Sequence, residues 1–230
     1  IWMKQKKLPS HDTLQKIGQT IQLTFDGVTE KGVTDPQEAL KLYLGSLLVG
    51  GDGAPTANGS MASFPNYLEQ EKIKQVYLNA TSENWKKLTD KFNSVGISVT
   101  TKDSKKYSIK FLLGTDAVHG DQHTVGKILF PHNIGRHVLT TLVTLKMLAI
   151  GPNKELRKLD LTLHLLHVLQ LLTILNGEEH IKDGTIRQYI ELYAKSYVKG
   201  LQDVSLGKIR GVLGSVKHFL GDGSTKHGAN

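Results

Sequence analysis

Residues 114–135 read GTDAVHGDQHTVGKILFPHNIG and directly follow Ile109–Leu113, an apolar run typical of a buried β-strand. The stretch holds three His and two Asp between glycines. In α/β folds, ligands bind where strands end and the following loops begin. We therefore predict that this stretch lies at the ligand-binding edge of a parallel sheet.

The chain before this stretch alternates between helical and strand patterns, which favours α/β units and a parallel sheet. The expected elements are a helix from Asp12 to Gln22, a helix capped by Thr34 or Asp35 that ends at Gly45, a strand over Leu47–Val49 leading into a glycine-rich loop to Ser63, and one or two helices over 66–92.

A second strand followed by polar residues lies near the C-terminus. The apolar run Val212–Val216 predicts this strand, and Lys217, His218 and Asp222 come after it among glycines. Because parallel strands end at one edge of a sheet, the two polar clusters are candidates for a shared site.

The composition favours a folded protein and gives no sign of a membrane or nucleic-acid partner. Hydrophobic residues make up 39% of the 230 residues and charged residues 22%, as in ordinary globular domains. The net charge of +8 comes from scattered Lys and Arg, so no basic cluster that would bind nucleic acid is predicted. No apolar run approaches the roughly 20 residues that span a bilayer. The absence of cysteine excludes disulfides and thiolate metal sites.

Three segments, GTDAVHG, LFPHNIG and KHFLGDG, resemble in sequence and order the N-terminal barrel domain of glycoside hydrolase family 3, the family of β-glucosidases and exo-glucanases. The flanking segments KIGQTIQL, GSLLVGGDGAP and YVKGLQ are also similar to family segments. The resemblance covers residues 12–134 and 190–230. It implies an α/β fold, a partial (β/α)8 barrel, with residues 1–230 forming one incomplete domain.

The resemblance implies a retaining β-glucosidase mechanism with two carboxylates, acting on a β-glucoside or β-glucan oligosaccharide. The family's nucleophile lies in a later SDW-like motif and its acid/base in the following domain, so this chain alone is expected to be inactive. No cofactor or metal is implied. By family analogy the protein would be extracellular or periplasmic, although the chain shows no signal peptide.

The resemblance assigns the sugar-binding roles to three residues. Asp116 matches the Asp that accepts hydrogen bonds from ring hydroxyls, and Lys217 and His218 match the pair that contacts the same sugar. His119 and Asp222 are further candidates. A carboxylate can accept from two neighbouring hydroxyls, and such charge-assisted bonds are roughly twice as strong as neutral ones.

Other interpretations stay open at this point. Asp116 could instead cap the next turn, with Lys217 at the surface and His218 buried and satisfied. The chain could be a non-catalytic carbohydrate-binding remnant. His119 and His123 are four residues apart and invite a zinc site, but they lie in a glycine-bounded loop without an H-E-x-x-H arrangement, and we expect His119 and His132 to brace loops.

Residues 136–181 do not match the family, although the flanking motifs have the family's separation. Combining the last base of each codon with the first two of the next permits HNPQWGR across Leu172–Glu179, close to the family's Arg-bearing motif. The same operation permits Phe-Ala-Pro-Thr within Leu161–Leu166, where the family has a strand. We hypothesise that this segment is a frameshifted reading, in which case the binding-site Arg is missing.

The alternative for this segment is a genuine amphipathic helix. Leu161, Leu165, Leu169 and Leu172 have helical spacing, and Leu favours helix. We therefore expect a Leu-rich helical segment to replace the region around the third strand of the barrel, whether or not the frame is shifted.

The frameshift hypothesis predicts that the nucleotide sequence shows a shifted frame beginning near residue 136 and ending near residue 181. The peptide masses between Arg157 and Arg187 provide the protein-level check after trypsin digestion. An uninterrupted gene together with peptides of the printed sequence would remove the hypothesis.

Overall fold

The computed structural model describes residues 13–24, 35–50, 53–63, 68–100, 103–117, 119–130, 163–166, 185–202, 204–205, 208–209 and 211–216. The contacts divide the chain into two compact units, which are described separately below. The first contains residues 1–116, 123–126 and 158–161, and the second contains residues 117–122, 127–157 and 162–230.

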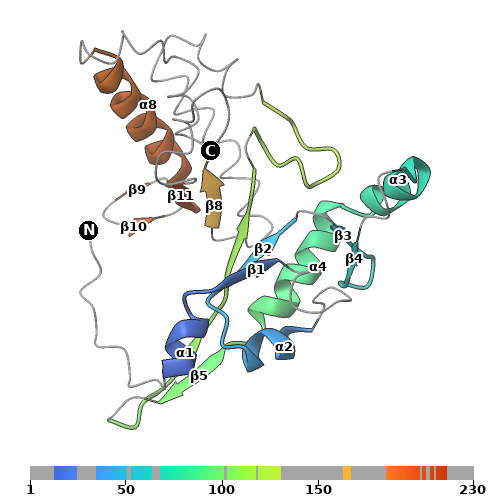
Figure 1. The fold of residues 1–230 in the computed structure, drawn as a ribbon, viewed down its shortest axis with the longest axis vertical. Coiled ribbons are helices and arrows are strands. Elements are labelled where there is room, and N and C mark those ends of the chain that lie inside the picture. The colour runs from blue at the N-terminus through green and yellow to red at the C-terminus, as the bar shows by residue number, and fades with distance from the viewer. Residues whose placement is uncertain are drawn as a thin grey trace. The chain divides into compact units, whose positions relative to one another are not determined.

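Three parallel strands form the centre of the first unit (Figure 1). They are β1 (Gln22–Thr24), β2 (Ser46–Val49) and β7 (Leu112–Thr115), with β2 between the other two. Leu47 pairs with Leu113, and both side chains are fully buried. The parallel arrangement that the alternating pattern predicts is confirmed here, and the carboxyl ends of the three strands meet at one edge.

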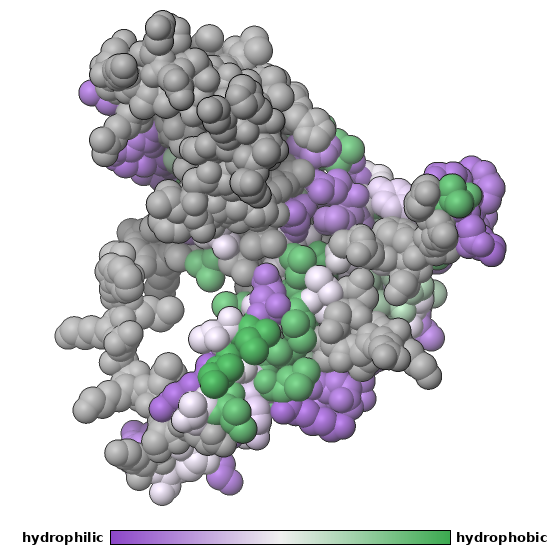
Figure 2. Space-filling model, viewed as in Figure 1, coloured by the Kyte–Doolittle hydropathy of each residue, from purple (hydrophilic) through white to green (hydrophobic). Residues whose placement is uncertain are grey.

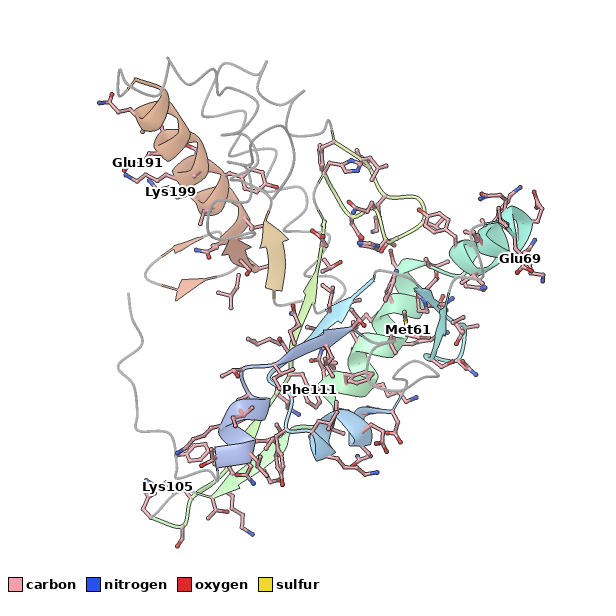
Figure 3. The ribbon with its side chains drawn as sticks, viewed as in Figure 1. Met61, Glu69, Lys105, Phe111, Glu191 and Lys199 are labelled. Atoms are coloured by element: carbon pink, nitrogen blue, oxygen red, sulfur yellow. The ribbon has the colours of Figure 1, made fainter. Side chains whose placement is uncertain are left out.

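Helix α4 (Ser82–Asn93) supplies much of the hydrophobic core of this unit. Trp85, Leu88 and Phe92 recur at helical spacing and are each at most 2% exposed. Phe92 packs edge-on against Phe111, the residue before β7, with ring centroids 6.2 Å apart. Figure 3 shows Phe111 among the side chains between helices and strands. These contacts fix the strand that leads into residues 114–135.

Helices α2 (Pro36–Lys41), α3 (Gln70–Leu78) and α4 agree with the local signals. Helix α2 begins after Asp35, whose carboxylate accepts from the backbone N–H of Gln37 at 2.9 Å. Helix α2 ends before Gly45. The region 66–92 contains two helices, α3 and α4, and Thr81 caps the second one.

Helix α1 (Thr13–Gly18) is shorter than the expected helix, which was extended to Gln22. At Gly18 the chain approaches residues 42–45 closely, since a Cβ there would lie 2.4 Å from the carbonyl oxygen of Leu42. The amide of Gln19 then donates to the carbonyl of Tyr43 at 2.8 Å. The segment after this contact pairs with β2 as β1, because tertiary pairing outweighs weak helical spacing.

Two antiparallel hairpins of the first unit were not expected. Strands β3 (Gly53–Pro55) and β4 (Met61–Ser63) pair where the sequence predicted only a glycine-rich loop. Strands β5 (Ile97–Thr100) and β6 (Lys106–Ile109) form the other hairpin. The predicted strand Ile109–Leu113 is therefore divided, because its start pairs with β5 and its end with β2.

The second unit contains the parallel pair β8 (Leu163–Leu166) and β11 (Leu213–Val216). Strand β11 confirms the predicted C-terminal strand. Helix α8 (Thr185–Gln202) packs on it through Leu201, and the Gln202 side chain accepts from the Gly214 N–H at 3.3 Å. The short strands β9 (Val204–Ser205) and β10 (Lys208–Ile209) pair antiparallel.

Strand β8 corrects the prediction of a helix in the Leu-rich segment. Residues 163–166 are extended and pair residue by residue with β11. Leu has good helix propensity, but propensity is a weak preference that strand pairing can override. The strand falls within Leu161–Leu166, where the family resemblance places one, and the rest of 136–181 lies outside the described residues.

The described strands do not close into a barrel. β1 is hydrogen-bonded to β2, and no second neighbour of β1 occurs in the described part of the chain. Figure 2 shows apolar surface over α1 and β1. The side chains of Leu14 and Ile17 in α1 are exposed. No helix in the described ranges has the length and apolar character needed to cross a membrane.

Replacing Leu88 by Ala tests the core under α4. Leu88 is fully buried, so we expect Leu88→Ala to lower the free energy of unfolding by about 2–5 kcal/mol. Leu78→Ala is the matched control, since Leu78 ends α3 and is 51% exposed, and its effect should stay within about 0.5 kcal/mol. Urea unfolding measures both, and equal losses would contradict this packing.

Candidate functional site

Asp116 is the first residue after β7 and is half-buried as a residue, while its side-chain Oδ1 is inaccessible to solvent. The last paired residues of β2 and β7 are Val49 and Thr115, so Gly50 and Asp116 follow them at the same edge of the sheet. Thr115 is itself buried. Asp116 thus begins the loop directly after a hydrogen-bonded strand, and this strand holds the backbone of Asp116 in place.

The imidazole of His123 contacts both of these strand ends. Its Nε2 lies 3.2 Å from the backbone oxygen of Asp116. A carbonyl oxygen can only accept a hydrogen bond, so the proton of the bond resides on Nε2. On its other side the ring faces Gly50, where a Cβ would lie 2.8 Å from Cγ of His123. A larger residue at position 50 would therefore collide with the ring.

The backbone of residues 123–125 is tied to the helices of the first unit. The indole Nε1 of Trp85 in α4 donates to the carbonyl of His123 at 2.8 Å. The N–H of Val125 donates to the carbonyl of Ala80, between α3 and α4, also at 2.8 Å. Each such bond contributes about 1 kcal/mol net. Together they hold the imidazole against the sheet edge from the helix side.

Thr124 lies between these two anchors and is 3% exposed. Its hydroxyl oxygen has no hydrogen-bond partner among the residues that the structure describes. Buried polar groups are normally paired with protein or ordered water.

In the second unit, His119 braces the loop that follows. Its Nδ1 donates to the carbonyl of Phe130 at 3.1 Å, and the N–H of Phe130 returns a bond to the carbonyl of His119 at 2.7 Å. Gly120 has φ +112°, a conformation that residues with a Cβ rarely adopt. This role agrees with the expectation that His119 braces a loop; His132 lies outside the described residues.

Of the five predicted site residues, the structure describes Asp116 and His119, one in each unit. Lys217, His218 and Asp222 lie outside the described residues, so their convergence on Asp116 stays a prediction. Strand β11 ends at Val216, and Lys217 and His218 follow it directly in sequence. Within the described ranges, no group of three or more His, Asp or Glu side chains is arranged to hold a metal ion.

Sequence analysis missed the residues that support Asp116. His123 was weighed only as half of a zinc pair, while Trp85 lay in the region 66–92, predicted only as helical, and Gly50 in a predicted loop. The Trp85–His123 bond joins residues 38 positions apart. Neither periodicity nor local spacing carries a signal for a contact of that kind.

The sequence matches the model of the glycosyl hydrolase family 3 N terminal domain over residues 16–230. No curated protein matches the chain.

Two solved structures with TM-scores above 0.5 share the fold. An exo-1,3/1,4-β-glucanase from a Pseudoalteromonas species has a TM-score of 0.58 and 24% identity, with 95% of this chain and 24% of the glucanase covered. A mutant of that enzyme has a TM-score of 0.56 and 24% identity, with coverages of 95% and 31%. A β-N-acetylhexosaminidase from Beutenbergia cavernae has a TM-score of 0.44 and 15% identity, with coverages of 91% and 54%. The chain thus spans less than a third of the length of the two glucanase chains.

The contact between Gly50 and His123 can be tested with two Gly→Ala substitutions. Gly50 has φ +99° and lies under the imidazole, whereas Gly126 has φ +78° and no atom within 4 Å of a built Cβ. Ala at either position is strained, which costs more than about 1 kcal/mol. We expect Gly50→Ala to lower the free energy of unfolding distinctly more than Gly126→Ala in urea denaturation. Equal losses would mean that the ring does not rest on Gly50.

Proposed function

The chain belongs to glycosyl hydrolase family 3, and on that premise we propose that it supplies the sugar-binding part of a domain that hydrolyses β-glucosides. The observation that carries the proposal is the position of Asp116 in GTDAVHG, directly after a buried parallel strand. Ligands of α/β sheets gather at this edge.

The environment of Asp116 suits the recognition of a pyranose. The residue as a whole is half-buried, its Oδ1 is inaccessible to solvent, and its backbone is held by β7 and by His123. A carboxylate whose backbone is held in this way can accept from a ring hydroxyl at little ordering cost. The preference for a β-glucoside or β-glucan oligosaccharide rests on the resemblance of the three motifs to the family.

Lys217 and His218 complete the proposed subsite. They directly follow β11 in sequence, as Asp116 follows β7. An ammonium and an imidazole would donate to the sugar oxygens that the carboxylate leaves unpaired. His119 and Asp222 are proposed as loop residues near the same sugar.

By the family resemblance, the nucleophile of hydrolysis lies in an SDW-like motif and the acid/base in the following domain. A retaining glycosidase uses two carboxylates about 5 Å apart, one as nucleophile and one as acid/base. No SDW-like motif occurs in this sequence. We therefore propose that the 230-residue chain binds a sugar weakly and does not hydrolyse it by itself.

This proposal predicts weak, Asp116-dependent binding of glucose without turnover. The amide resonance of Asp116 should shift in an NMR titration at high millimolar glucose, while calorimetry with glucose or cellobiose shows almost no heat. A hydrogen bond to a charged group contributes roughly 1.5–3 kcal/mol, so Asp116→Ala should weaken binding at least about tenfold. An aryl β-glucoside should be left intact.

Three outcomes would count against the proposal. Turnover of the aryl β-glucoside that Asp116→Ala abolishes would show that the chain is catalytically complete. Strong heat with cellobiose and no turnover would favour the carbohydrate-binding remnant instead. A wild-type spectrum unchanged by glucose would remove the sugar subsite.

A further inference from the structure

His123 lies beside Asp116, although none of the predicted sugar contacts is assigned to His123. It bridges the ends of β2 and β7, donating to the backbone oxygen of Asp116 at 3.2 Å while its ring faces Gly50. It therefore contacts the backbone of the residue that carries the candidate carboxylate. All of these residues belong to the first unit.

This contact and the sheet pairing before it restrain the backbone of Asp116 from both sides. A residue has two soft backbone dihedrals, φ and ψ. Pairing of Thr115 with Val49 in the sheet restrains the peptide before Asp116 and so φ. The bond from His123 to the Asp116 carbonyl restrains the peptide after it and so ψ. With both restrained, the Cα–Cβ direction of Asp116 is set.

His123 can serve as a fixed point because it is itself held. Its carbonyl accepts from the indole of Trp85, and Val125, two residues on, donates to Ala80. Gly50 leaves room for the imidazole against the sheet, since a Cβ there would collide with it. A site holds its ligand geometry when the binding residue is supported by groups that are themselves packed and hydrogen-bonded.

We propose that His123 is a positioning residue, which orients Asp116 for sugar binding through the backbone oxygen of Asp116 and does not touch the sugar. This inference rests on the proposed function, since it concerns the same subsite. It separates two roles in the loop: Asp116 supplies the acceptor group, and His123 sets the direction in which the Asp116 side chain leaves the backbone.

The test compares three variants of the full 230-residue chain. His123→Phe keeps a ring but loses the donor, whereas His123→Gln is long enough to place an amide N–H near the position of Nε2. Gln19→Met is the matched control. It also removes a side-chain donor to a backbone carbonyl of the first unit, but at Tyr43, away from Asp116.

Three NMR measurements report on these variants. The ring nitrogens of wild-type His123 should show the proton on Nε2. Relaxation of the 116–117 peptide should report lost order in His123→Phe and restored order in His123→Gln. In glucose titrations, His123→Phe should lose roughly five- to tenfold in affinity, the range expected when a binding group must be ordered on binding. His123→Gln should return to within about twofold.

Several results would overturn the proposal. These are a wild-type ring protonated only on Nδ1, a His123→Phe variant with wild-type order at residue 116 and wild-type glucose affinity, or a Gln19→Met variant with the same losses as His123→Phe. Should His123→Phe not fold, His123→Asn takes its place, since its shorter amide cannot reach the Asp116 carbonyl. If glucose shifts no wild-type resonance, the sugar function fails, and the tautomer and the relaxation of residue 116 still decide whether His123 positions Asp116.

Discussion

The parallel pairing of β2 with β7 is the constraint on which the rest of the first unit depends. It buries Leu47 against Leu113 and brings Gly50 and Asp116 to one edge of the sheet. Phe111, just before β7, packs on α4, so the helix and the strands share one core. The polar loop can then be anchored from two sides, by the strand ends and by the helix.

Local signals in the sequence were enough to predict the elements whose stability is local. Asp35 caps α2 from the position directly before the helix. The apolar face of α4 is formed by residues of that helix alone. The predictions were wrong for segments whose conformation is set by pairing with a strand that is distant in the sequence. The run Ile109–Leu113 divides because β5 and β2 each pair with one part of it. Residues 163–166 are extended because β11 lies beside them.

The same distinction applies to the candidate site. Asp116 could be named as a candidate because a motif surrounds it in the sequence. Its supporting residues could not, because the bond from Trp85 to His123 and the contact of His123 with Gly50 are made between distant parts of the chain. The short motif KIGQ has a comparable explanation: Gly18 permits a close approach to Leu42, and Gln19 donates to the carbonyl of Tyr43. These residues place the end of α1 against the turn before β2.

His123 and His119 both donate to main-chain oxygens, at Asp116 and Phe130 respectively. Every amino acid carries that oxygen. The hydrogen bond from His123 to the backbone of residue 116 therefore does not depend on which side chain stands at position 116. The backbone conformation of the loop is therefore independent of the functional group that the side chain at position 116 carries. Evolution could exchange the carboxylate for an amide or a hydroxyl, and so change the ligand, on a scaffold that need not be rebuilt.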